Sequence, residues 1–422
     1  ACLCGSVAEN TLPLLIRILT ATVFNRHRHL KYRRFGPSVS RGAPVIGWKK
    51  TFICSFVAQV LSIGGFSFAL PFLPFFIRDL GITDKAQQAW WAGIILGACG
   101  VTMAIFAPLW GILADRHGRK NMVTRSMLGG TLVLILMSFS RNVIDLLICR
   151  FLQGALTGTV SASVALVASV TPERRSGLAL GMMQAAVYVG VSLGPLFGGL
   201  LADHFGYRVA FRVGALVILL GGLLVHYGTH EEFTPPDEHD VEPVSYRTLL
   251  TSGMFLTAIC ILLAVRFANT IFNPSFPLII ADILHSPERL NSVTGIIMAL
   301  SGMAGAVSAG ILGHVGDRYG HRHVVIACSL VAAVTAAAHA LVYTIPSLTV
   351  VHILFGLAVS GTMPAANAMI RCHTDSLNMG KAFGAAAAIG TIGLALGPLT
   401  GGFLARDLGI RAPFFAAGMC QL

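Results

Sequence analysis

Charged residues are scarce in this sequence. Asp, Glu, Lys and Arg make up 11% of its 422 residues, and its mean hydropathy is +0.75, whereas soluble globular chains carry about 25% charged residues. The charges fall in short clusters between apolar stretches of roughly twenty residues, each long enough to cross a bilayer. This scarcity argues against a water-soluble helical bundle and indicates an all-α integral membrane protein.

The sequence also lacks the patterns of an enzyme or a receptor. Its nine cysteines show no paired metal-binding spacing, and most lie in apolar stretches, where a thiol behaves as a small buried hydrophobe. There is no phosphate-binding loop and no soluble catalytic domain, and His321 and His323 belong to a basic loop, where charge is the simpler explanation. We therefore expect no metal, no cofactor, no disulfide framework and no enzymatic activity.

The net charge of +12 does not indicate nucleic-acid binding, because of where the basic residues lie. Residues 1–45 hold seven Lys and Arg and one acid, and most of the remaining excess lies beside membrane stretches, where cytoplasmic loops collect Lys and Arg. The expected partners are the lipid bilayer, a small molecule and protons, with no nucleic acid.

Both ends of the sequence look cut. The first methionine is Met103, inside the second apolar stretch, so we expect a start upstream or near Val45. Residues 11–24 are apolar but short and carry Arg17, which predicts a segment that lies on the membrane. We treat 1–47 as an N-terminal segment that is uncertain or disordered, and expect the last membrane helix, from about Ala412, to be truncated.

Eleven complete spans and the truncated twelfth divide the chain into two halves. An acidic, proline-bearing linker at 228–248 separates an N-terminal bundle of six helices at 48–227 from a C-terminal bundle at 249–422, and should be a solvated connector. The spans are expected near 52–76, 91–112, 123–140, 143–168, 179–202, 209–227, 250–280, 291–312, 323–343, 348–370 and 382–404.

The distribution of Lys and Arg predicts the orientation. With residue 50 in the cytoplasm, the inner loops and span ends hold thirteen Lys and Arg and the outer ones eight. Because basic residues favour the cytoplasmic side, we expect a multi-pass plasma-membrane protein, in the bacterial inner membrane, with its N-terminus and central linker in the cytoplasm.

An internal repeat relates the two halves. Its three landmarks occur in the same order at an offset of 202 or 203 residues. They are Gly111-Ile-Leu-Ala-Asp115-Arg116 with Gly313-His-Val-Gly-Asp317-Arg318, Gly194-Pro195-Leu-Phe-Gly198-Gly199 with Gly397-Pro398-Leu-Thr-Gly401-Gly402, and the Pro-x-x-Pro pair at Pro71 and Pro274. Since each half has six spans, the repeats run parallel about an axis normal to the membrane, and a cargo site should lie near the midplane between them.

The stretch from Gly111 to Lys120 resembles the loop signature of the major facilitator superfamily. The resemblance covers about residues 48–420 and implies a major facilitator fold with a cytoplasmic latch that breaks and re-forms as the halves rock; a purely topological basic loop is the alternative. The expected latch residues are Gly111, Asp115, Arg116, Gly118, Arg119, Lys120, Asp317 and Arg318.

Two further motifs point to one branch of this superfamily. Arg150 and Gln153 in the fourth span resemble its second signature, and the fifth span resembles the signature of the twelve-helix drug:proton antiporter family, with details most similar to MdtG-like multidrug exporters. That signature implies export, although small-residue packing alone could explain it. Its residues are Gly190, Gly194, Pro195, Gly198 and Gly199.

The charges inside the membrane are basic. None of the eighteen carboxylates lies mid-membrane, a departure from exporters of cationic drugs that carry an acid in the first helix. Arg150 and Arg266 do lie within spans, and Asn269 and Asn273 follow Arg266 at i+3 and i+7, on one helical face. A positive cavity favours neutral or anionic amphipathic cargo; snorkelling of Arg150 and bonding of Arg266 to carbonyls are the alternatives.

His352 follows Arg150 by 202 residues and is its counterpart in the tenth span. Because histidine titrates near neutral pH, it is a candidate proton carrier, with Asp115 and Asp145 as rivals and a neutral packed ring as the alternative. We expect a monomeric secondary transporter that exports small amphipathic compounds, drugs included, in exchange for protons. Uptake or facilitated diffusion of a metabolite is the alternative function.

Overall fold

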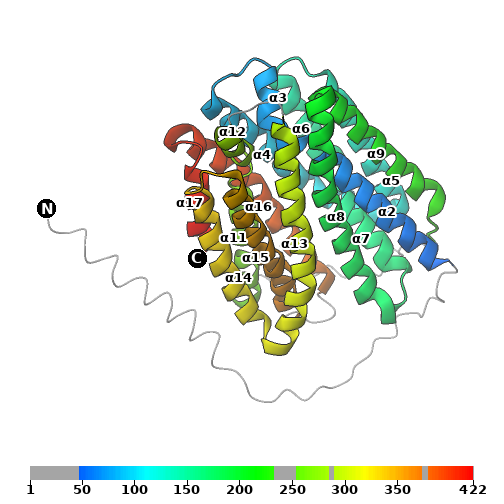
Figure 1. Ribbon diagram of the computed structural model, residues 1–422. Coiled ribbons are helices and arrows are strands. Elements are labelled where there is room, and N and C mark those ends of the chain that lie inside the picture. Colours follow the sequence, from blue (N-terminus) through cyan, green and yellow to red (C-terminus); the bar gives the residue numbers. More distant parts are fainter. Residues whose placement is uncertain (1–46, 232–252, 285–288, 373–378, 422) are drawn as a thin grey trace.

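The computed structural model describes residues 47–231, 253–284, 289–372 and 379–421, and these residues form helices joined by short turns (Figure 1). The part of the chain that it describes contains no strand, so the expected all-α class is confirmed. The helices are α2 (Trp48–Ser67), η1 (Leu70–Phe72), α3 (Leu73–Asp79), α4 (Lys85–His117), α5 (Arg119–Phe139), α6 (Val143–Leu156), α7 (Thr159–Val170), α8 (Glu173–Phe205), α9 (Tyr207–Gly228), α11 (Gly253–Thr270), α12 (Phe276–Leu284), α13 (Leu290–Tyr319), α14 (His321–His339), α15 (Ile345–Cys372), α16 (Met379–Leu408) and α17 (Ala412–Gln421).

Three of the expected spans contain an interruption of the helix. The first divides into α2 and α3 at the 3₁₀ turn that contains Pro71, the fourth into α6 and α7, and the seventh into α11 and α12 beside Pro274. Proline cannot donate an internal helical hydrogen bond, and Gly158 takes φ +143° between α6 and α7, a conformation that favours glycine. Apolarity predicts where the chain crosses the membrane, but not these interruptions.

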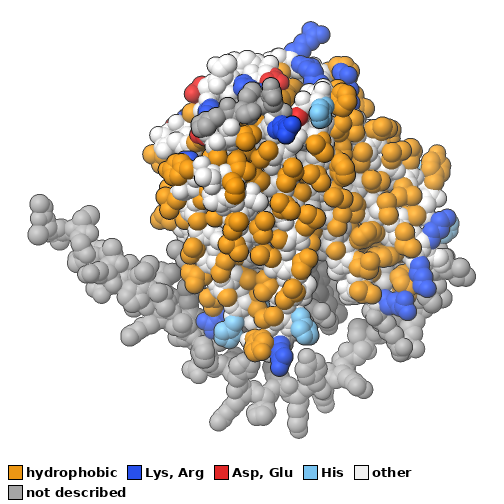
Figure 2. Space-filling model, viewed as in Figure 1, with side chains coloured by type: hydrophobic (Ala, Val, Ile, Leu, Met, Phe, Trp, Pro, Cys, Tyr) orange, Lys and Arg blue, Asp and Glu red, His pale blue; other side chains and the backbone are white. Residues whose placement is uncertain are grey.

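Exposed apolar side chains cover the middle of the face shown in Figure 2, while charged groups collect toward the two ends. Ten helical runs in the described ranges are long and apolar enough to cross a membrane. Large side chains such as Ile105, Leu132 and Val307 are more than half exposed on these helices. In water this surface would aggregate, whereas in a bilayer lipid chains cover it.

Helices from the two halves meet along two seams. In one seam α4 packs against α16, and in the other α8 packs against α13 (Figure 1). The end of the molecule at which α4 begins is called the Lys85 end, and the end at which α4 turns into α5 is called the Gly118 end. In the repeat, α4 corresponds to α13 and α8 corresponds to α16. The two seams are therefore equivalent to each other.

Glycine contacts show that the halves meet at the Lys85 end and separate at the Gly118 end. A Cβ atom placed on Gly93 of α4 would lie 3.0 Å from the Cα atom of Gly402, and one placed on Gly295 of α13 would lie 2.9 Å from the carbonyl carbon of Pro195. Toward the Gly118 end, a Cβ atom on Gly111 or Gly310 would meet nothing within 4 Å. In Figure 1, α8 and α13 diverge toward that end.

Candidate functional site

A small cavity of about 110 Å³ lies between the halves, beside the α4–α16 seam. Arg150 of α6 and Asn273, in the turn between α11 and α12, contribute its polar side chains. The full lining is Leu96, Cys99, Gly100, Met103, Arg150, Asn273, Leu394 and Pro398. Two of the expected cavity residues thus come together in one pocket that is mostly apolar and has no carboxylate in its lining.

Arg150 is held at this pocket by its own half. Its Nε donates to the backbone oxygen of Ile95 at 3.2 Å, and its Nη1 donates to Oε1 of Gln153. Only 5% of Arg150 and 4% of Gln153 is exposed, so Arg150 does not snorkel to the surface. A Cβ atom on Gly154 would lie 2.9 Å from the backbone nitrogen of Met103, and this close approach of α6 to α4 brings Arg150 to the cavity.

The expected polar face of the seventh span is only partly formed, and this is a correction. The helix α11 ends at Thr270, so helical spacing does not extend to Asn273. Asn269 accepts a hydrogen bond at 2.6 Å from Nε2 of Gln421 in α17. Asn273 instead lines the cavity with Arg150, and Asn269 serves contacts within the C-terminal half.

Arg266 lies nearer to the Gly118 end than the close glycine contacts between α4 and α16 do. It is an exposed residue that packs beside α16, where a Cβ atom on Gly393 would lie 3.0 Å from its Cβ atom. Its guanidinium also lies near the side chain of Tyr188 of α8, in the other half. This second guanidinium therefore belongs to the region between the halves.

His352 lies within the C-terminal half and not in the cavity lining. It is 8% exposed, and its Nδ1 lies 3.0 Å from Nε2 of His339, a residue that the sequence did not single out. Since Nδ1 of His339 lies 2.6 Å from the carbonyl oxygen of Thr335, which can only accept, Nδ1 of His339 carries a proton. In the neutral pair, Nε2 of His339 then accepts from Nδ1–H of His352.

An aromatic shell encloses the histidine pair. The ring of Phe276 stacks on His352 with centroids 4.2 Å apart, and the ring of Phe414 stacks on His339 at 5.5 Å. The rings of Phe272 and Phe355 complete this shell. His352 and Arg150, equivalent in the repeat, thus occupy different environments.

The antiporter-type motif of α8 has two packing faces. Gly190, Gly194 and Gly198 lie against α2 in the same half, where a Cβ atom on Gly190 would lie 2.7 Å from Cβ of Ile63. Pro195 and Gly199 face α13 of the other half instead. One face therefore seals a bundle, and the other lies in the seam between the bundles.

Three of the expected latch residues, Gly111, Arg116 and Arg318, lie in open or exposed positions in this structure. A Cβ atom on Gly111 or Gly313 meets nothing within 4 Å, and Arg116 and Arg318 are exposed. Gly118 adopts φ +86° between α4 and α5. The side chains of Asp115 and Asp317 lie outside the described part of the structure.

Glu231, near the start of the expected linker, holds the start of α5. Its Oε1 accepts from the backbone N–H of Arg119 at 3.0 Å, and its Oε2 accepts from that of Lys120 at 2.7 Å. The Nζ of Lys120 donates to the backbone oxygen of Thr229 at 2.9 Å. The first linker residues thus cap a helix of the N-terminal half; residues 232–248 lie outside the described ranges.

Comparisons with known proteins agree with this architecture. The family model of the Major Facilitator Superfamily matches residues 55–265 and 258–419. The chain belongs to the major facilitator superfamily. It is a membrane transporter and not an enzyme. Its resemblance to the MdtG-like group is confirmed by relatives named multidrug resistance protein MdtG. The relative from Rahnella sp. (strain Y9602) is 31% identical over 379 residues, 89% of this chain and 92% of the relative, and that from Proteus mirabilis (strain HI4320) is 32% identical over 370 residues, 87% of this chain and 92% of the relative.

Solved structures share the major facilitator fold at low sequence identity. A bacterial homologue of the human lysosomal transporter Spinster, inward-facing and occupied, matches with a TM-score of 0.72 and 14% identity, over 90% of this chain and 95% of that one. The human organic anion transporter MFSD10 (TETRAN) matches with a TM-score of 0.67 and 17% identity, over 89% and 97%. The two-bundle fold expected from the repeat is confirmed.

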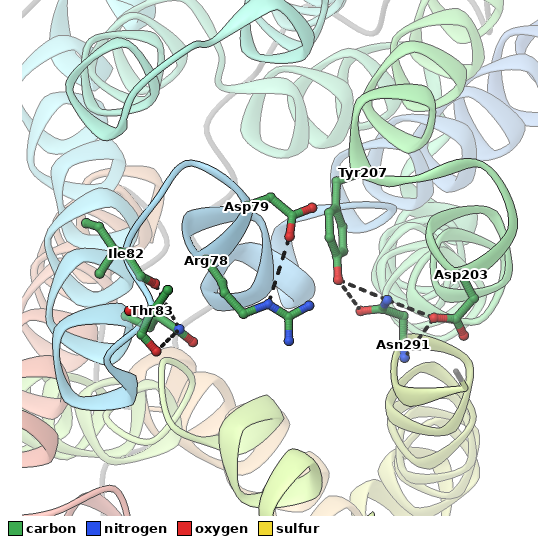
Figure 3. Close-up of polar contacts among 8 residues, drawn as sticks. Arg78, Asp79, Ile82, Thr83, Asp203, Tyr207 and Asn291 are labelled. Carbon is green, nitrogen blue, oxygen red and sulfur yellow. Dashed lines mark hydrogen bonds and ion pairs between the residues drawn. The ribbon is translucent and has the colours of Figure 1, made fainter. Parts of the chain in front are cut away.

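Three polar residues that the sequence did not single out connect separate helices in the structure. They are His339 in the aromatic shell, Glu231 at the start of α5, and Asp203 at the Lys85 end (Figure 3). The repeat offset gave no signal for them, because none has an equivalent residue of the same type. A carboxylate at or just beyond the end of a membrane helix is a weak signal, since such residues are usually solvated.

Proposed function

We propose that this transporter exports small amphipathic compounds that are neutral or anionic, drugs among them, in exchange for protons by alternating access. The observation that carries the proposal is the mostly apolar cavity between the halves, with Arg150 in its lining. Its relatives named multidrug resistance protein MdtG support drug export. A single chain encloses this cavity, and we therefore propose a monomer as the transporting unit.

The charge around the cavity supports the choice of cargo. Arg150 lines the cavity and Arg266 lies between the halves, whereas the lining contains no Asp or Glu. A guanidinium in a site of low polarity attracts an anion more strongly than it would in water. Leu96, Met103 and Leu394 offer apolar contacts to the remainder of the cargo. A permanent cation would gain the apolar contacts but would be repelled by Arg150.

Alternating access follows from the asymmetry between the two ends. We propose that the Gly118 end faces the cytoplasm, as the Lys and Arg distribution predicts, so this structure is open toward the cytoplasm. Cargo enters from that side, and the halves then rock so that the Lys85 end opens. In that second state the latch residues of the Gly118 end, Asp115 and Arg116 among them, meet the opposite half.

For the proton, we propose His352 together with His339. In the neutral pair the bond between Nδ1 of His352 and Nε2 of His339 already holds a proton, so a proton taken up by the pair would add at Nε2 of His352. The backbone oxygen of His352 accepts from Oγ of Ser301 in α13 at 2.8 Å, so a shift of α15 on protonation would reach the α8–α13 seam. In the described part of the chain, the pair is contacted by four phenylalanine rings and the backbone oxygen of Thr335, so no carboxylate among these neighbours would compensate the charge of an extra proton.

Transport into proteoliposomes under an imposed pH gradient tests the proposal. Purified protein is reconstituted, and accumulation of matched aromatic amphiphiles is followed: one with a carboxylate, one uncharged and one with a quaternary ammonium group. Proton-driven exchange predicts accumulation of the first two on the acidic side and collapse of the gradient-driven signal when a protonophore is added. Preference for the quaternary ammonium compound contradicts the cargo assignment, and movement of cargo together with protons would favour uptake of a metabolite instead.

A further inference from the structure

The helix α13 begins without a cap of its own. Its N-cap residue, Arg289, makes no side-chain hydrogen bond to the first turn. The first N–H groups of a helix have no partner within the helix and need one from elsewhere. The helix α4, which occupies the equivalent place in the other half, solves this locally, because the side chain of Asp84 accepts from the backbone N–H of Gln87 at 2.9 Å.

The missing cap of α13 comes from the opposite half. Asp203, near the end of α8, directs its carboxylate to the start of α13 (Figure 3). Its Oδ1 accepts from the backbone N–H of Asn291 at 3.2 Å and from Nδ2 of the same residue at 2.8 Å. Its Oδ2 accepts from the backbone N–H of Ser292 at 2.7 Å and from the hydroxyl of Ser292. Both oxygens of one carboxylate thus serve a helix that belongs to the other half.

The negative charge of Asp203 is compensated mainly by these hydrogen bonds. Among the described residues, no Lys or Arg forms an ion pair with it. Arg208, one turn of chain away, donates to the backbone oxygens of Ser138 and Ser140 instead. The hydroxyl of Tyr207 bonds the side chain of Asn291. The positive end of the α13 dipole therefore faces the carboxylate.

The contact lies where α8 and α13 pack closely against each other. Asn291 is 5% exposed, and a Cβ atom on Gly199 would lie 2.8 Å from its carbonyl carbon. Separation of α8 from α13 at this end would break all four hydrogen bonds of Asp203 at once. Water would then have to satisfy the start of α13 and the carboxylate.

We propose that Asp203 is the latch that holds the Lys85 end closed, by supplying a helix cap across the interface that moves. This inference rests on the proposed alternating access and adds to it the group that sets the balance between the two states. The contact stabilises the state in which the cavity opens at the Gly118 end. Its loss shifts the resting equilibrium toward the state that is open at the Lys85 end.

Distance measurements between two spin labels test this latch without any transport assay. Labels are placed on Arg141→Cys and Leu341→Cys, exposed sites in loops at the Lys85 end, one in each half. The nine native cysteines are replaced by serine or alanine. In lipid nanodiscs the parent protein should show mainly the short distance. Asp203→Ala should raise the ratio of long to short distances about tenfold, the upper part of the range for loss of a cap, and Asp203→Asn, which keeps one acceptor oxygen, by less.

A matched carboxylate provides the control. Asp407 lies near the end of α16, the repeat equivalent of α8, but its oxygens pair with the neighbouring Arg406. Asp407→Asn should leave the distance ratio within about twofold. Should Asp203→Ala fold poorly, Ser292→Ala removes one donor from the opposite side and should shift the ratio in the same direction. An unchanged ratio in these variants, or an equal shift with Asp407→Asn, overturns the latch even if transport is normal. A shift without proton-driven transport by the parent protein leaves the latch standing and removes the proposed function.

Discussion

The two halves of this transporter share their packing of small residues but differ in their polar contacts. Gly194 lies against Gly64 of α2, and its repeat equivalent Gly397 lies in the same way against Phe267 of α11. Yet Arg150 lines the cavity, whereas its equivalent His352 is enclosed by aromatic rings. The repeat therefore specifies how helices approach, and side chains that differ between the halves specify what binds and what switches.

The same contrast holds for the two seams. The α8–α13 seam is joined by the partly buried contacts of Asp203, while the α4–α16 seam carries the stacking of Arg406 on Trp90 at 4.5 Å. Lys85 and Asp282 also link the halves, but both side chains are substantially exposed to solvent, where ion pairs contribute little. The α8–α13 seam should therefore resist separation more than the α4–α16 seam.

The largest loss of stability is expected from substitution of buried glycines that occupy equivalent positions in the two halves. Gly198→Leu and Gly401→Leu should both prevent folding, because a Cβ atom at either position would collide with backbone atoms, of Phe68 and Ile271 respectively. Overpacking of this kind costs about 3 kcal/mol or more. Size-exclusion profiles and thermal unfolding of detergent-purified protein measure this.

Gly177→Leu is the matched control, since a Cβ atom there meets nothing within 4 Å. It should yield folded protein with a nearly unchanged profile. If one of the two buried glycines tolerates leucine and the other does not, the packing of the halves is less alike than the structure indicates.

The next largest effect is expected at Arg150, whose substitution should change the uptake of anionic cargo. Arg150→Ala should lower uptake of the carboxylate-bearing amphiphile at least about tenfold, since a charge-assisted contact is worth about 1.5–3 kcal/mol. Uptake of the uncharged analogue should fall much less. Arg150→Lys, which keeps the charge but loses the hydrogen bonds of Nε and Nη1, should be intermediate. Equal losses for both amphiphiles would indicate a structural role for Arg150.

His352→Gln should abolish the coupling of transport to protons and leave the binding of cargo unchanged. Glutamine retains polar atoms but cannot carry a proton at neutral pH. We expect cargo binding to be kept while accumulation driven by the pH gradient is lost, and His339→Gln to behave alike. Unchanged accumulation in both variants would remove this pair and return attention to Asp115 and Asp145.

A smaller effect is expected at Glu231, which caps α5 in the N-terminal half, whereas α14 has no side-chain cap at its N-cap residue Gly320. Glu231→Gln should destabilise the protein by about 1 kcal/mol and lower its unfolding temperature by a few degrees. Lys85→Ala should have the smallest effect, about 0.5 kcal/mol or less. A larger loss from Lys85→Ala than from Glu231→Gln would contradict the ranking of these contacts.

Much of the fold was predictable because it depends on local composition and on repetition. Apolar length located the spans, and the offset of about 203 residues paired Gly194 with Gly397. The breaks beside Pro71 and Pro274 were not predicted, because proline is tolerated inside some membrane helices, as Pro195 within α8 shows.

The site was less predictable, because it depends on contacts between distant residues. Arg150 and Asn273 were singled out as polar residues inside apolar spans, and the structure brings them to one cavity. Nothing in the sequence linked Asp203 to Asn291, or His339 to His352, since these partners carry no shared motif. Only the packing of whole helices defines those pairs.

Cys99 gives the most direct test of the central claim, because it lines the cavity beside Arg150. In proteoliposomes of protein with Cys99 as its sole cysteine, a charged thiol reagent that cannot cross the membrane is applied to one side at a time. The account predicts modification from either side, slowed by the carboxylate-bearing amphiphile but not by the quaternary ammonium compound. Modification from one side only, whatever the cargo or pH gradient, would contradict a cavity that opens alternately to both sides.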